Sequence, residues 1–140
     1  MKKILIINGP NINMLGIREP EIYGHETYQD LLAYIESSAK DIGIEVQCFQ
    51  SNSEGAIIDE IQSAYGKYSG IVINPGAYTH TSIAIPDALK AVAMPAVEVH
   101  LSDISKREEF RRVSYTSFAC IETIAGKGFS GYRLAIERLL

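Results

Sequence analysis

Short runs of apolar residues alternate along this chain with segments in which apolar residues recur at helical spacing. The run at 4–7 is apolar throughout, which is typical of a strand buried on both faces of a parallel sheet. Further runs of strand character lie at 45–50, 70–73, 96–101 and about 118–124. The pattern therefore predicts five strands.

Between these runs, apolar side chains recur every three or four residues, which predicts helices over about 27–43, 53–66, 82–93 and 129–140. Thr27 is a candidate N-cap of the first helix, because Asp30 follows it at capping-box spacing. Pro86 is compatible with the third helix only if it lies in the first turn. Ser105 and Glu108 have the spacing of a second capping box, which predicts a short helix after the fourth strand.

This alternation of strands and helices favours an α/β sandwich with helices on both faces of a parallel sheet. We expect a flavodoxin-like three-layer fold with five parallel strands in the order 2-1-3-4-5. No internal repeat or linker interrupts the sequence, so residues 1–140 are expected to form a single domain. In this order strands 1, 3 and 4 are neighbours, and ligands bind beyond their carboxyl ends. The polar loops at 11–23, 74–80 and 100–102 follow those same strands.

The longest loop, about 9–24, contains two prolines and three glycines, which excludes a continuous helix. Loops of this length often act as lids or binding loops, and we expect this one to be an active-site lid. It carries Arg18 and Tyr23. An ordinary tyrosine has a pKa of about 10, but a nearby cation favours the phenolate, so Arg18 is a candidate activator of Tyr23 as a general base. The alternative is that Tyr23 only anchors the loop.

The fourth strand places an acid and an imidazole side by side. Period-2 alternation puts Glu98, His100 and Ser102 on one face of that strand. Burying these groups in a parallel sheet is costly unless they are paired. Either Glu98 and His100 form a structural pair that closes the strand end, or the carboxylate orients a catalytic imidazole. The other two histidines lie in loops; His80 precedes a helix start, and His25 is expected at the surface.

The composition of the chain indicates which class of protein it belongs to and where in the cell it is expected. The chain is 46% hydrophobic and 21% charged, as expected of a soluble globular protein, and no apolar run approaches the about 20 residues of a membrane span. The run at 4–7 is too short for a signal sequence, so we expect a cytoplasmic protein. A net charge of −4 argues against non-specific binding to nucleic acid. Cys48 and Cys120 are far apart in sequence and are expected to be buried thiols.

The residue pattern leaves two functional classes open. The chain has no glycine-rich dinucleotide fingerprint, no P-loop, no zinc-spaced cysteines and histidines, and no G-x-S-x-G elbow. All seven lysines lie outside the three polar loops, which argues against Schiff-base chemistry there. The chain is either an enzyme that transfers protons within these loops or a flavodoxin-like module that binds a small anion or nucleotide without chemistry.

Several separate motifs resemble type II 3-dehydroquinate dehydratases. They lie, in family order and spacing, at 9–24, 50–55, 74–82, 98–102, 107–111 and 128–140. The resemblance implies the conversion of 3-dehydroquinate to 3-dehydroshikimate and water, in the shikimate pathway of aromatic amino acid biosynthesis. It also implies an anti elimination through an enolate, without metal or cofactor, and a homododecamer assembled from trimers.

The resemblance also implies a role for each matching residue. Tyr23 is similar to the base that removes the proton alpha to the ketone, and Arg18 to the lid arginine that keeps it ionised and stabilises the transition state. Asn11 is similar to the asparagine that holds a water against the enolate oxygen. His100 is similar to the acid that protonates the departing hydroxyl, and Glu98 to its orienting carboxylate.

A further set of residues is similar to those that hold the substrate in this family. The set is Asn74, His80, Asp87, Leu101, Ser102 and Arg111. Leu101 and Ser102 would face the substrate carboxylate with backbone N–H groups. Asp87 would reach the site of a neighbouring subunit. The intact set argues against a third possibility, an inactive relative that serves as a structural subunit.

Overall fold

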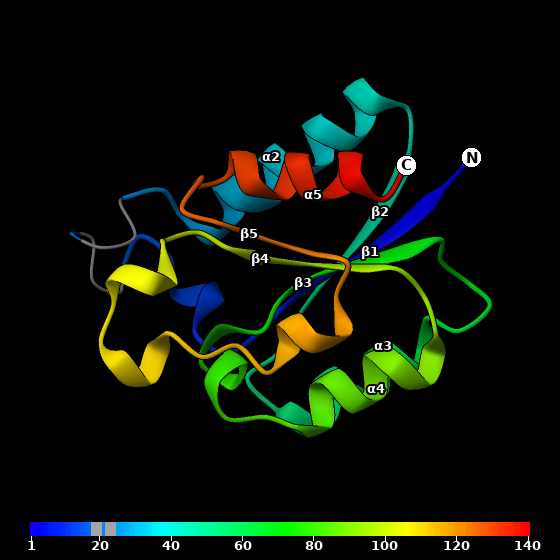
Figure 1. Cartoon of the computed structure of the whole chain (residues 1–140). Helices are drawn as coiled ribbons and strands as arrows, with labels where there is room; N and C mark the ends of the chain where they lie inside the picture. The colour runs from blue at the N-terminus through cyan, green and yellow to red at the C-terminus, as the bar shows by residue number, and fades with distance from the viewer. Residues whose placement is uncertain (18–20, 22–24) are drawn as a thin grey trace.

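A parallel sheet runs through the middle of the molecule (Figure 1). The computed structural model describes residues 1–17, 21 and 25–140. Within these residues five strands pair in the order β2-β1-β3-β4-β5, which confirms the predicted order. The strands are β1 (Lys3–Asn8), β2 (Glu45–Gln50), β3 (Gly70–Asn74), β4 (Ala96–His100) and β5 (Glu122–Ala125).

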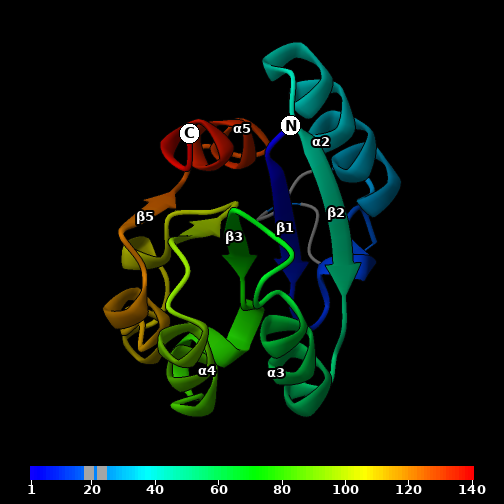
Figure 2. The same ribbon diagram turned by 90° about the vertical axis from the view of Figure 1, so that its right-hand side faces the viewer.

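Helices cover both faces of this sheet (Figure 2). Helices α2 (Tyr28–Ile42) and α5 (Ser130–Arg138) lie on one face, and α3 (Glu54–Ser63) and α4 (Ala84–Val92) lie on the other. Along β1, Ile4 and Ile6 pack in the core beneath α2 and α5, while Leu5 and Ile7 pack in the core beneath α3 and α4. All four side chains are fully buried, which explains why the run is apolar at every position.

Local signals at the helix ends match the structure. Thr27 and Asp30 form the predicted capping box, in which the Asp30 N–H donates to Thr27 Oγ1 at 3.2 Å and the Thr27 N–H donates to Asp30 Oδ2 at 2.9 Å. Pro86 is the third residue of α4, within its first turn as required. No helix in the described residues is long and apolar enough to cross a membrane.

The prediction of a short helix from Ser105 to Glu108 is wrong. Two 3-10 turns lie there instead, η3 (Ile104–Lys106) and η4 (Glu109–Arg111). The Ser105 hydroxyl donates to Asp103 Oδ1 at 2.6 Å, and the same carboxylate accepts the Ser105 N–H at 3.0 Å. Glu108 pairs with Arg111 at 2.8 Å rather than with the Ser105 backbone. The capping-box partners therefore have other contacts, and no α-helix begins.

The predicted fifth strand begins too early. Residues Thr116–Ala119 form the 3-10 turn η5, and β5 begins only at Glu122. The apolar run misled the prediction because two of its side chains face outward; Phe118 is 77% exposed and Ile121 is 62% exposed. The cysteines also differ slightly from expectation. Cys48 and Cys120 are free but only partly buried, and burial raises the pKa of each thiol to about 12.

The loops that follow β1 and β3 touch at their first residues. The Gly9 N–H donates to the Asn74 carbonyl at 2.7 Å. A Cβ atom on Gly9 would lie 2.4 Å from the Pro75 carbonyl oxygen, which is closer than real Cβ atoms approach. Gly9 is therefore required because two backbones meet there, and this contact brings the loops after β1 and β3 together.

We expect Gly9→Ala to destabilise the protein by about 1–3 kcal/mol, since backbone on both sides must shift to admit the methyl group. The measurement is the urea midpoint of unfolding at fixed protein concentration. Gly55→Ala is the matched control, because Gly55 lies in α3 with only Ser53 Oγ near, at 3.9 Å, and alanine is the better helix former by about 0.5–1 kcal/mol. Equal midpoints for the two variants would contradict the close-approach argument.

Candidate active site

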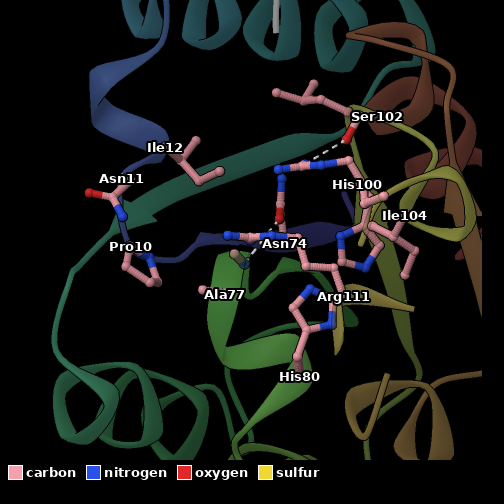
Figure 3. Close-up of a pocket in the computed structure, with 13 residues that line it drawn as sticks. Pro10, Asn11, Ile12, Asn74, Ala77, His80, His100, Ser102, Ile104 and Arg111 are labelled. Carbon is pink, nitrogen blue, oxygen red and sulfur yellow. Dashed lines mark hydrogen bonds between the residues drawn. The ribbon is translucent and has the colours of Figure 1, made fainter. Parts of the chain in front are cut away.

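A pocket opens beyond the carboxyl ends of β1, β3 and β4 (Figure 3). Most of the predicted site residues line it, namely Asn11, Asn74, His80, His100, Leu101, Ser102 and Arg111. They come from the three loops and from the 3-10 turns η2 (Gly76–His80) and η4. Arg18 and Tyr23 lie outside the described residues. Asp87 is exposed on α4 and does not line the pocket, whereas Glu98 is buried beside His100.

Glu98 and His100 share one face of β4, as the alternation predicted. His100 Nε2 bonds to Glu98 Oε2, and both residues are almost completely enclosed. Because a carboxylate only accepts hydrogen bonds, Nε2 carries a proton when Glu98 is ionised. Nδ1 is then the ring nitrogen that remains for a ligand in the pocket. A proton bound at Nδ1 can be given to a ligand while Glu98 stabilises the charged ring.

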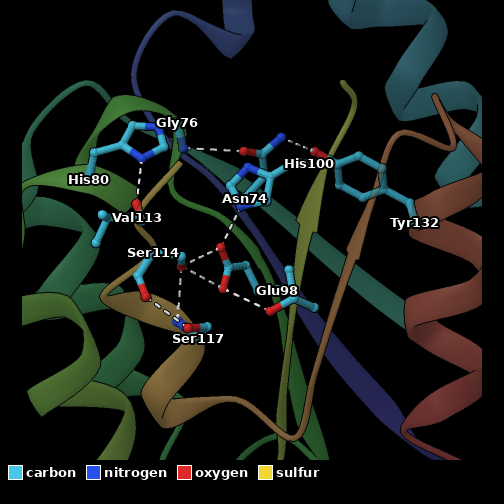
Figure 4. A network of polar contacts seen from close by, with 10 residues as sticks. Asn74, Gly76, His80, Glu98, His100, Val113, Ser114, Ser117 and Tyr132 are labelled. Carbon is cyan, nitrogen blue, oxygen red and sulfur yellow. Dashed lines mark hydrogen bonds and ion pairs between the residues drawn. The ribbon is translucent and has the colours of Figure 1, made fainter. Parts of the chain in front are cut away.

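His80 is held in one tautomer by the backbone. Its Nδ1 lies 2.7 Å from the Val113 carbonyl oxygen, which only accepts, so Nδ1 carries the proton and donates it (Figure 4). Burial lowers the pKa of His80, and the nearby His100 and Arg111 lower it further, against the opposing effect of that hydrogen bond. The neutral ring therefore presents Nε2 as an acceptor for a ligand hydroxyl.

Asn74 is oriented by a buried network that the sequence did not reveal. Its Nδ2 donates to the Tyr132 hydroxyl at 3.0 Å, and its Oδ1 accepts the Gly76 N–H at 3.2 Å. The Tyr132 hydroxyl donates in turn to Asn8 Oδ1 at 2.5 Å. These bonds assign the amide oxygen and nitrogen of Asn74. Burial raises the pKa of Tyr132, so this hydroxyl keeps its proton and can serve as both donor and acceptor.

Two arginines give this face of an acidic chain a local positive charge. Arg107 and Arg111 both line the pocket, and Arg107 Nη1 lies 3.5 Å from Ser102 Oγ. Arg112 does not line it, and its Nε donates to the Arg107 carbonyl at 3.1 Å. Arg107 was therefore missed as a pocket residue, although the cluster of three arginines was the signal that could have found it. Guanidinium groups in this position suit a carboxylate or another small anion.

The described residues contain no group of three His, Cys, Asp or Glu side chains that is placed to hold a metal ion. The groups at this pocket are the Glu98–His100 pair, the imidazole of His80, the amide of Asn74 and the guanidinium groups of Arg107 and Arg111.

The chain is similar to known proteins over almost its whole length. Residues 2–140 match the family described as Dehydroquinase class II. The chain belongs to the class II dehydroquinase family. The 3-dehydroquinate dehydratase of Clostridium acetobutylicum is 61% identical over 137 residues, which cover 98% of this chain and 95% of the relative. That of Geotalea daltonii is 56% identical over 137 residues, with the same coverage of both.

Solved structures agree with the fold of this class II dehydroquinase. The type II dehydroquinase of Butyrivibrio crossotus has a TM-score of 0.97 at 55% identity, covering 99% of this chain and 97% of the other. The enzyme of Propionibacterium acnes has a TM-score of 0.95 at 44% identity, covering 99% and 96%. The expectation of a type II dehydroquinase from the sequence motifs is confirmed.

We expect His80 to remain neutral, with its proton on Nδ1, at pH values below the ordinary histidine pKa of about 6.5. The sign follows from burial, because a lowered pKa means that more acid is needed to charge the ring. The check is magic-angle-spinning NMR of protein labelled with ¹³C and ¹⁵N histidine, with the His80 signals assigned from their loss in His80→Asn. A proton on Nε2, or a ring already charged at pH 6.5, would refute the assignment.

Proposed function

We propose that this chain is a 3-dehydroquinate dehydratase, which converts 3-dehydroquinate to 3-dehydroshikimate and water in the shikimate pathway. The observation that carries the proposal is the Glu98–His100 pair at a pocket bordered by Arg107 and Arg111, in a chain with class II dehydroquinase relatives along its whole length. Such a pocket suits a small anionic substrate that must lose a hydroxyl group.

The substrate carboxylate would lie at Leu101 and Ser102, near Arg107. Backbone N–H groups and the Ser102 hydroxyl would donate to it, and the positive charge of Arg107 would favour the anion. Asn74 and Arg111, which also line the pocket, would hold substrate hydroxyls. The neutral His80 would accept from a hydroxyl at Nε2, because its Nδ1 is already committed to Val113.

The elimination would proceed through an enolate. Removal of the proton alpha to the ketone places negative charge on oxygen, and preorganised donors lower the barrier to this step. Asn11 lines the pocket and would hold a water against that oxygen. His100 would then give a proton from Nδ1 to the departing hydroxyl, which leaves as water, while Glu98 stabilises the ring.

The base would be Tyr23, activated by Arg18. Both residues lie outside the described residues, so their roles depend on the match to the family motif in 9–24. A guanidinium beside a phenol favours the phenolate, which is the form that can accept a proton. This segment would be a lid of a single catalytic domain formed by residues 1–140, and it would close over the substrate and keep bulk water out of the pocket. No metal or cofactor enters these steps.

We further propose that the enzyme works as trimers assembled into a homododecamer in the cytoplasm. Four apolar side chains of segment 110–121 are exposed, Phe110, Val113, Phe118 and Ile121, each at least 49%. Four large exposed apolar side chains within twelve residues would favour a contact with another protein surface. Turn η5 in this segment packs against α4, where Asp87 is exposed. Asp87 would therefore lie near a subunit contact and reach the site of the neighbouring copy.

We expect purified protein to convert 3-dehydroquinate to a conjugated enone, measured as a rise in ultraviolet absorbance. Turnover is expected to survive pretreatment with borohydride in the presence of substrate, because no lysine lies in the three polar loops. Loss of turnover after borohydride would indicate that the same reaction proceeds through an imine with a lysine and not through the proposed mechanism. No turnover from a folded, assembled sample would favour the binding module instead.

Tyr23→Phe is the matched control for this assay. It removes the phenol oxygen alone, so nearly all turnover should disappear while the fold and ligand binding persist. Normal turnover in this variant would exclude Tyr23 as the base.

We expect Phe118→Asp to lower the mass of the assembly and to reduce turnover, because it places a charge among the exposed apolar side chains of segment 110–121. Mass is measured by size-exclusion chromatography with light scattering. Tyr65→Asp is the control, since Tyr65 is 72% exposed but follows α3 and is not part of this segment. Unchanged mass in Phe118→Asp, or equal dissociation in both variants, would count against this interface.

A further inference from the structure

The fully buried Glu98 carboxylate has hydroxyl donors on the side away from the pocket (Figure 4). The Ser114 hydroxyl lies 2.7 Å from Oε2 and 2.9 Å from Oε1, and Thr123 Oγ1 donates to Oε1 at 3.2 Å. His100 binds the same Oε2. Both oxygens are therefore satisfied without water, which is what an ionised carboxylate inside a sheet requires.

The direction of the Ser114 hydroxyl is fixed by its own turn. The Ser117 N–H donates to Ser114 Oγ at 3.1 Å, and the Ser117 hydroxyl donates to the Ser114 carbonyl at 2.7 Å. Since a hydroxyl has a single proton and Ser117 occupies its acceptor side, that proton points to Glu98. Thr123 is placed independently, because the register of β4 and β5 sets it beside Glu98.

We propose that Ser114, assisted by Thr123, is a positioning residue for proton delivery by His100. The inference rests on the proposed function, in which His100 is the acid. Ser114 holds the Glu98 carboxylate in place, and Glu98 accepts the proton on His100 Nε2, so that Nδ1 faces the departing hydroxyl. When the C–O bond breaks, its electron pair leaves with oxygen, the oxygen takes the Nδ1 proton and departs as water, and the enolate electrons form the C=C bond.

The alternative arrangement explains why the donors matter. Without them the buried carboxylate would lack the hydrogen bonds that replace water, and nothing on that side would fix its position against His100. A displaced Glu98 no longer holds the Nε2 proton, so His100 is badly placed to give its Nδ1 proton to the departing hydroxyl. The loss would therefore fall on departure of the hydroxyl and not on removal of the alpha proton.

One short segment thereby orients both pocket histidines. The Val113 carbonyl accepts from His80, and the next residue, Ser114, holds the carboxylate that pairs with His100. Arg111 precedes them in the same segment and also lines the pocket. Residues 111–114 therefore supply a guanidinium group to the pocket, fix the tautomer of His80 and hold the carboxylate that pairs with His100.

The test is Ser114→Ala, with elimination and exchange measured together in D₂O. Elimination is followed by absorbance, and exchange by mass spectrometry of deuterium in recovered 3-dehydroquinate. We expect kcat to fall roughly tenfold with KM little changed, because the interaction acts in the transition state. The ratio of exchange to elimination should rise, since the enolate still forms but returns to substrate. Equal loss of both reactions, or a change in KM alone, would overturn the proposal.

Two variants separate positioning from general damage to the turn. Ser114→Thr keeps the hydroxyl and is expected to restore most of kcat. Ser117→Ala removes the hydroxyl that donates to the Ser114 carbonyl but keeps the Ser117 N–H that orients Ser114 Oγ, so its exchange ratio should match the wild type. A raised ratio in Ser117→Ala, or no recovery in Ser114→Thr, would indicate a structural role.

A second readout does not need the reaction. In protein labelled with ¹³C and ¹⁵N histidine, magic-angle-spinning NMR reports whether the His100 Nε2 proton remains in the bond to Glu98. We expect this signal to shift in Ser114→Ala and to stay in place in Ser117→Ala. If the wild type has no dehydratase activity but the signal depends on Ser114, the proposed function fails while the positioning role stands. An unchanged signal in Ser114→Ala overturns the positioning role itself.

Discussion

The site depends on the burial of one carboxylate inside a parallel sheet. Glu98 is fully enclosed in β4, where a charge is tolerated only if hydrogen bonds replace the water it has lost. Those bonds come from His100 on its own strand, from Thr123 on β5 and from Ser114 in the loop between. Ser114 lies between the 3-10 turns η4 and η5, in the segment that returns from β4 to β5.

The order of the strands in the sheet brings the other site residues together. The carboxyl ends of β1, β3 and β4 lie side by side, so polar residues that end these strands meet at one edge. Asn8 and Asn74 are paired in the register of β1 and β3, and the Tyr132 hydroxyl bridges their side chains from α5. Buried hydrogen bonds therefore hold Asn74 at the pocket, which Arg107 and Arg111 also line. Polar groups fixed in this way need little reorganisation to stabilise a developing charge.

Much of the fold and of the site was predictable from the sequence. The strand at 4–7, the cap at Thr27 and the Glu98–His100 pair all depend on spacing along one element, and spacing is visible in a sequence. The short helix at Ser105 and the early start of β5 were wrong for a shared reason. In both places the local pattern was formed by residues that serve another structure. Ser105 belongs to a 3-10 turn capped by Asp103, and the apolar residues before β5 are exposed at the surface.

The sequence alone determined three things: the alternation of strands and helices, the loops that converge, and the family. The first two follow from the periodicity of apolar residues, and the family follows from motifs that can be read along the chain. Only the tertiary structure decided which distant groups complete the site. Tyr132 lies 58 residues from Asn74, Thr123 lies 25 residues from Glu98, and Ser114 lies 16 residues from Glu98. Nothing in their local sequence marks them, since a serine in a turn and a tyrosine on an apolar stripe have ordinary explanations. Their roles arise because folding removes water from a carboxylate and an amide, which must then find partners wherever the packed chain supplies them.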